Sequence, residues 1–102
     1  MKLESSSVME YPMKLTNVPL FFFEENGAVI CHCLPLDVSS CGRDLDEAKH
    51  NIKDAIEGFL EACEAMGTLE EVLTECGFVK DGTRWKSPVI LESDSIDVPL
   101  SA

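Results

Sequence analysis

The residues best suited to chemistry in this chain are Cys31, His32 and Cys33, because thiolate and imidazole groups are the usual ligands of zinc. Side chains alternate between the two faces of a β-strand, so on a strand both cysteines would face one way and His32 the other. The three residues therefore cannot bind one ion from that segment alone. Packing in a core explains the cysteines as small apolar residues, and we expect neither a metal ion nor a cofactor.

A Cys–His nucleophilic pair is the second chemistry that the sequence offers. His32 or His50 could activate a thiol, but such a pair needs proximity in space and a third, orienting group, which a sequence does not show. His50 falls on the polar face of a predicted helix, where an exposed histidine is the ordinary case. The five cysteines form an odd set without a regular framework, which favours reduced thiols over disulfides.

Three glutamates form the most coherent charged pattern. Glu57, Glu61 and Glu64 lie three or four residues apart near the end of a predicted helix, so they share one face. Like charges at this spacing, and acids near a helix C-terminus, are both unfavourable. A solvated helix face is the commonest explanation, and a docking surface for a basic partner is the alternative.

The elements that position these residues follow an order of three strands and one helix. Residues 15–24 predict a first strand, in which Pro19 indicates an edge or a bulge. Asn26-Gly27 predicts a tight hairpin turn, after which residues 28–34 return antiparallel to the first strand. A short third strand is expected over residues 37–41, directly before the helix.

The helix is predicted from its cap and its apolar periodicity. Asp44 is the expected N-cap, and Glu47 stands where its carboxylate can return to the backbone amide of the cap residue. Gly67 is the expected end of the helix. The three-four spacing that predicts one buried face is set by Leu45, Ala48, Ile52, Ala55, Ile56, Phe59, Cys63 and Met66.

A second, short helix is expected after the first. Thr68 and Glu71 predict another capping box, and Gly77 is the expected stop. Trp85 with residues 89–91 predicts a further strand, and residues 96–100 predict a short final extended segment.

Length and charge narrow the class of protein. With 102 residues, we expect residues 1–12 to be a flexible tail and residues 13–102 to form a single domain. No apolar run reaches the roughly 18 residues of a membrane span and no secretory signal is evident, so we expect a cytoplasmic protein. The net charge of −11 disfavours direct binding to DNA or RNA and suits a basic protein partner, although acidity also keeps small domains soluble.

Three consecutive phenylalanines, at positions 21–23, are too apolar for a strand with one face in water. We expect the helix to cover one face and a second subunit to cover the other. The chain is therefore predicted to form a homodimer or a higher oligomer, with Phe21 and Phe23 at the interface.

The stretch from Cys33 to Ile56 resembles the HicB-like antitoxin family, in a short form without a C-terminal DNA-binding module. The family usually has Thr where Asp44 stands, a departure that keeps the capping chemistry. The resemblance spans residues 15–66 strongly and the rest weakly. The positions that match the run typical of the family, without a gap, are Cys33, Leu36, Asp37, Val38, Ser40, Gly42, Glu47, Ala48, Asn51, Ala55 and Ile56.

The resemblance implies an α+β class and a partial RNase H-like fold. The expected architecture is a small antiparallel sheet of three to four strands, in β-β-β-α order, packed on one long helix, plus the short second helix. A nuclease would need several carboxylates converging on metal ions, whereas the acids here lie mostly on a helix surface, so we expect no enzyme. The predicted function is that of an antitoxin in a type II toxin–antitoxin system, which neutralises a small basic HicA-type ribonuclease toxin. The alternative is an orphan HicB-like oligomeric scaffold without a toxin partner.

Overall fold

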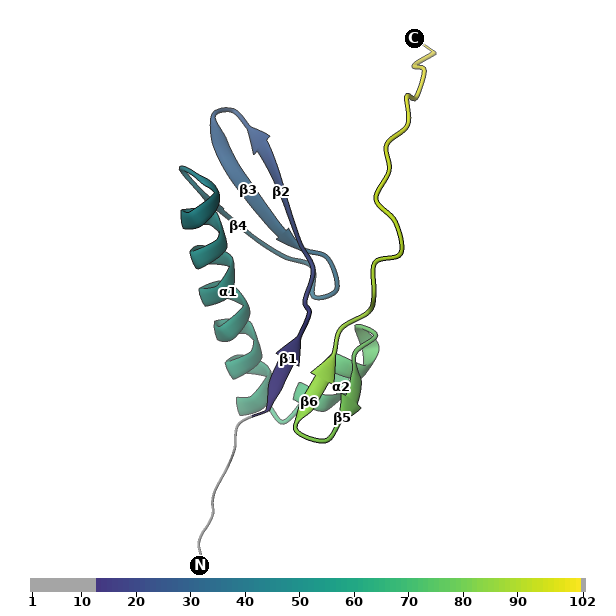
Figure 1. Ribbon diagram of the computed structural model, residues 1–102. Helices are drawn as coiled ribbons and strands as arrows, with labels where there is room; N and C mark the ends of the chain where they lie inside the picture. Colours follow the sequence, from purple (N-terminus) through teal and green to yellow (C-terminus); the bar gives the residue numbers. More distant parts are fainter. Residues whose placement is uncertain (1–12, 102) are drawn as a thin grey trace, which may run out of the picture.

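The computed structural model describes residues 13–101 and has two three-stranded sheets and two helices (Figure 1). The predicted α+β class is therefore confirmed. The tail predicted over residues 1–12 lies outside the described residues. Neither helix in the described part of the chain is long and apolar enough to cross a membrane.

The first sheet contains the antiparallel strands that the sequence predicts. It is built from β2 (Leu20–Glu25), β3 (Ala28–Cys33) and β4 (Val38–Gly42), in the order β2-β3-β4. Asn26 and Gly27 connect β2 to β3 with φ angles of 54° and 82°. Two consecutive positive φ angles are the requirement of a type I′ hairpin turn, so the predicted turn is confirmed.

One long helix, α1 (Leu45–Ala65), packs against β4 and β3. Its face toward the sheet buries Ala48 and Ile52 completely. These two side chains belong to the same core as Cys31 and Cys33, which are also fully buried. Helix α1 begins after Asp44 and is followed by Gly67 at a φ of 73°, as the sequence predicts.

A second, smaller sheet pairs the first strand of the described chain with the last two. Strand β1 (Lys14–Thr16) pairs in parallel with β6 (Arg84–Lys86), and β6 pairs antiparallel with β5 (Val79–Asp81). The short helix α2 (Leu69–Glu75) precedes this hairpin. Buried side chains from α2 and the second sheet extend the core that α1 shares with β3.

The single strand predicted over residues 15–24 is wrong, because the structure divides it between the two sheets. Asn17 has a φ of 57°, in the left-handed region, and Pro19 has no backbone N–H to donate. A ladder cannot continue through these two residues. Strand β1 therefore joins one sheet and β2 the other.

The predicted strand at residues 89–91 is also wrong. Its place is taken by β6, which ends at Lys86, and the last backbone bond to a neighbouring strand runs from Ser87 N to Thr16 O at 3.3 Å. Residues 88–101 are extended without a strand partner and run away from the second sheet (Figure 1). We call this segment the C-terminal arm.

The capping box predicted for α2 does not form. Thr68 makes no side-chain hydrogen bond to the first turn of α2. Its hydroxyl instead donates to the carbonyl of Cys63 at 3.3 Å, in the last turn of α1. Thr68 therefore helps to close α1 instead of opening α2.

Candidate protein-binding surface

The backbones of β4 and α1 approach each other closely at the corner between them. A Cβ atom on Gly42 would lie 2.5 Å from the backbone nitrogen of Ala48, so only glycine fits there. The amide of Asn51 donates to the carbonyl of Cys41 at 2.9 Å, one turn further along the helix. Together these residues hold the start of α1 directly against the end of β4.

Charged side chains stabilise the same corner. The carboxylate of Asp44 accepts a hydrogen bond from the backbone N–H of Glu47 at 2.8 Å, as predicted. The Glu47 carboxylate accepts from the backbone N–H of Arg43 at 2.6 Å, one residue before the predicted donor. The guanidinium of Arg43 also donates to Glu47, and these bonds hold the pKa of the Glu47 carboxyl below its usual range.

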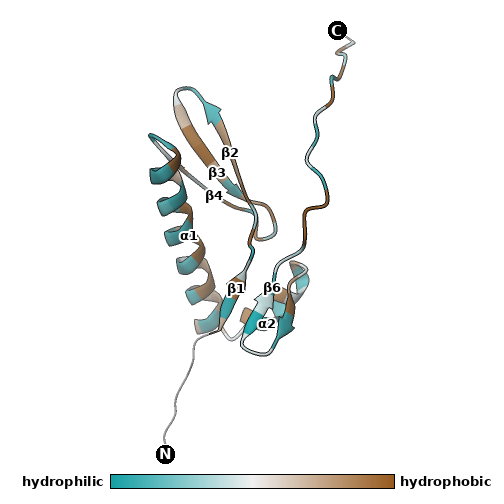
Figure 2. Ribbon diagram, in the orientation of Figure 1, coloured by the Kyte–Doolittle hydropathy of each residue, from teal (hydrophilic) through white to brown (hydrophobic). Residues whose placement is uncertain are grey.

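The acidic stripe, formed by Glu57, Glu61 and Glu64, is exposed along the C-terminal half of α1. Figure 2 shows hydrophilic residues along the side of α1 that faces away from the sheet. Glu57 forms an ion pair with Lys53 at 2.8 Å, whereas the last turn of α1 contains no basic residue. Lys53 thus partly neutralises the stripe at Glu57, whereas no basic residue of the last turn neutralises it at the end of the helix.

The Cys31-His32-Cys33 segment has the alternation that the sequence predicts. Both cysteines are buried, and burial raises the pKa of each thiol. His32 points to the opposite face, where its Nδ1 lies 2.6 Å from the hydroxyl of Ser39. Buried, protonated thiols are poor nucleophiles and poor metal ligands, and residues 13–101 contain no cluster of three or more metal-ligating side chains.

His50 is exposed on α1, and its Nε2 lies 3.4 Å from a carboxylate oxygen of Asp54. Its nearest charged neighbour is thus a surface acid one helical turn away, on the same exposed face. This arrangement is an ordinary surface pair.

Phe21 and Phe23 lie on the open face of the first sheet, opposite His32 and Ile30 of β3. Phe23 is 52% exposed there. Phe22 lies on the helix side, but α1 packs over β4 and β3 and leaves this ring 37% exposed. The helix therefore does not cover β2 as expected, and both faces of this strand remain apolar and accessible.

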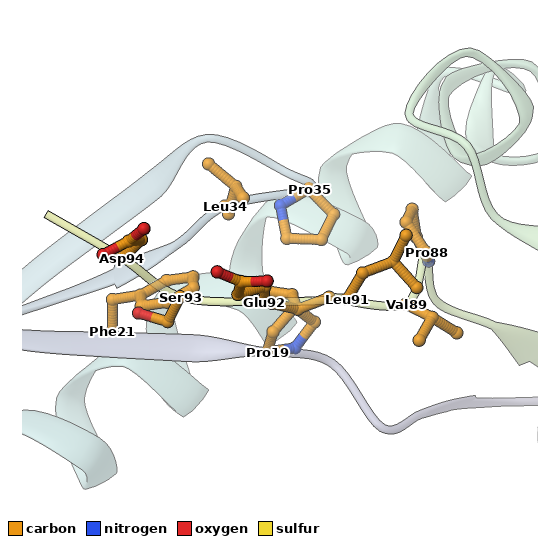
Figure 3. Close-up of a pocket in the computed structure, with 11 residues that line it drawn as sticks. Pro19, Phe21, Leu34, Pro35, Pro88, Val89, Leu91, Glu92, Ser93 and Asp94 are labelled. Carbon is orange, nitrogen blue, oxygen red and sulfur yellow. The ribbon is translucent and has the colours of Figure 1, made fainter.

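A cavity that the sequence pattern does not predict lies beside β2. It has a volume of about 600 Å³ and separates the C-terminal arm from the sheet. Figure 3 shows Pro19, Phe21 and Leu34 on its sheet side and residues of the arm, including Leu91, along the other. The apolar residues at 89–91 are the sequence signal for it, but their pattern predicts a strand.

No protein-family model matches this chain, and no curated protein or solved structure matches it significantly.

Proposed function

We propose that this chain is a HicB-like antitoxin of a type II toxin–antitoxin system, which binds a small basic HicA-type ribonuclease and is not itself an enzyme. The observation that carries the proposal is the β4–α1 corner. Gly42, Ala48 and Asn51, which match the family pattern, make the close contacts there. These contacts give the matching residues a shared structural role. They lie in the run β2-β3-β4-α1, which has the β-β-β-α order that the family pattern implies, although β1 precedes it in the chain.

The electrostatics of the chain suit such a partner. A net charge of −11 attracts a basic protein, and the acidic stripe concentrates part of this charge on one helix face. A cover of this kind would block a basic RNA-binding surface both by occupying it and by cancelling its charge. The same charge disfavours direct contact between the chain and nucleic acid.

The proposed location is the cytoplasm. All five cysteines are free thiols, and two of them, Cys31 and Cys33, are fully buried in the core. Free thiols are typical of a reducing compartment.

An orphan oligomeric scaffold without a toxin is the second candidate. The apolar open face of the first sheet favours it, because this face suits a contact between protein copies. The gene next to this one distinguishes the two: a short open reading frame for a basic protein supports the antitoxin, and its absence favours the scaffold.

The direct test is to reverse the charge of the acidic stripe. The triple variant Glu57→Lys, Glu61→Lys and Glu64→Lys should retain the fold, because exposed substitutions usually change the free energy of unfolding by only about 0.5 kcal/mol each. Its affinity for the basic protein encoded beside it should fall at least tenfold, mainly through slower association and a weaker dependence on salt. Surface plasmon resonance at several salt concentrations measures both.

A matched control changes the same number of charges elsewhere. Glu24→Lys, Glu25→Lys and Glu75→Lys alter three exposed acids outside α1. If the stripe is the docking surface, this control should bind almost as tightly as the parent. Equal losses in both triple variants would show that only net charge matters, and no loss in the first would remove the stripe from the interface.

A further inference from the structure

The first half of the C-terminal arm lies beside the open face of its own sheet. Pro19 and Phe21 border the cavity on the sheet side, and residues 88–94 border it on the other. Figure 3 shows Glu92 close to Pro19 and Asp94 beside Phe21. The arm and β2 run in the same direction in Figure 1, so the arm advances along β2 over this stretch.

The open face of the first sheet consists of rows of side chains that run across β2, β3 and β4. The strand register defines a polar row, which contains an imidazole and a hydroxyl group, as Phe21, His32 and Ser39. It defines the next row, which is apolar, as Phe23, Ile30 and Cys41. Phe23 and Cys41 are exposed, so no element of residues 13–101 covers the apolar row.

The residue pattern of the arm matches these two rows. Side chains two residues apart in an extended segment point the same way, and they are spaced by about 6.6 Å, as they are in a strand. Because Asp94 lies beside Phe21, the same spacing brings Ile96 to Phe23. The carboxylate therefore falls at the polar row and the isoleucine at the apolar row.

The attachment of the arm favours its own sheet over that of a second copy. Pro88, at the start of the arm, borders the same cavity as Pro19 and Phe21. A segment tethered this closely meets its binding site at an effective concentration on the order of millimolar. A second copy at micromolar concentration would need to bind about a thousandfold more tightly to occupy the same row.

We propose that the C-terminal arm is a strap that closes on the open face of its own sheet, with Ile96 packed on the apolar row. The structure shows the strap open, since Ile96 is 81% exposed. Closure fills the cavity and covers Phe23, so release of the strap controls whether another protein can reach the apolar row. This inference does not depend on the proposed function, because the acidic stripe lies on α1, which packs on the other face of the sheet.

Disulfide trapping in the full chain tests closure. The variant carries Phe23→Cys and Ile96→Cys, together with Cys41→Ser to remove an exposed native thiol. Mild oxidation should give a monomer on a non-reducing gel that has lost two thiols, at a rate that does not change with protein concentration. Mass spectrometry should assign the bridge to the peptides that contain positions 23 and 96.

The matched control for trapping moves the second thiol along the arm. Leu100→Cys takes the place of Ile96→Cys, and an extended backbone puts position 100 about 13 Å beyond position 96. This control should form a bridge roughly tenfold more slowly, because its thiol projects past Phe23. A covalent dimer in place of the bridged monomer, the absence of a bridge, or equal rates in the two variants would overturn the proposal.

A second measurement reports on the strap without added cysteines. Ile96→Asp places a charge against the apolar row, so the arm should be released and fluorescence of the dye anilinonaphthalene sulfonate should rise about twofold or more. Val79→Asp is the matched control, because Val79 is 64% exposed on β5, and it should leave the fluorescence unchanged. Circular dichroism checks that both variants are folded. Equal fluorescence of the folded Ile96→Asp variant and the parent would show that the arm does not cover the row.

Discussion

At the residue scale, Gly42 has no room for a side chain. Its missing side chain lets β4 approach the backbone of α1, and any Cβ atom there would meet the backbone nitrogen of Ala48 at 2.5 Å. Backbone atoms cannot move aside as the end of a flexible side chain can. The contact therefore fixes how closely the helix and the sheet approach each other.

We expect Gly42→Ala to lower the free energy of unfolding by about 1–3 kcal/mol, the usual cost of overpacking. Gly58→Ala is its matched control within α1, since a Cβ atom at Gly58 meets nothing within 4 Å. This control should raise stability by roughly 0.5–1 kcal/mol, because alanine favours the helix. Urea unfolding of both variants measures the difference, and equal effects of the two substitutions would contradict the argument.

Single residues also show how far sequence reasoning reaches. Asp44 was correctly predicted as the cap of α1, because its bond to Glu47 N depends on residues three positions apart. The partner of the Glu47 carboxylate was missed by one residue, since the guanidinium of Arg43 draws that carboxylate toward its own backbone. Local spacing identifies the cap residue, whereas competition between neighbouring charged groups decides which backbone N–H the Glu47 carboxylate accepts from.

At the element scale, the helices and the hairpin of the first sheet follow from periodicity and turn residues, but the strands at the two ends of the chain do not. Strand β1 pairs with β6, which lies about 70 residues later in the chain. Such a pairing leaves no local pattern in a segment of three residues. The segment 89–91 carries a better strand pattern than β6 and remains unpaired.

The two helix starts should respond differently to loss of a side chain. Asp44→Ala removes the hydrogen bond that caps α1 and should cost about 0.5–2 kcal/mol of stability. Thr68→Ala removes no cap from α2, so α2 should keep its amide protection in hydrogen exchange. Loss of protection confined to α2 in the Thr68 variant would mean that its hydroxyl caps that helix in solution.

At the scale of the whole molecule, one core connects the two sheets. Cys31 of β3, Ile52 of α1 and Leu73 of α2 are fully or almost fully buried in the same cluster, which also contains Phe78 and Trp85. The side chains of α1 and α2 thus join elements that the chain order separates. The length predicts a single domain. This stays a prediction, and it requires the two sheets to unfold together.

Ile52→Ala tests that cooperativity. The side chain is fully buried, so its truncation should lower the free energy of unfolding by roughly 2–5 kcal/mol. Trp85 is the one tryptophan of the chain and lies in the second sheet, so its fluorescence reports on that sheet while far-UV circular dichroism follows mainly α1. Because both share the core with Ile52, the two signals should shift together to lower urea concentration, at a fixed protein concentration.

Leu45→Ala, at a side chain that is 60% exposed, should shift neither signal appreciably. If Ile52→Ala moved the circular dichroism transition and left that of Trp85 in place, the two sheets would unfold as separate units.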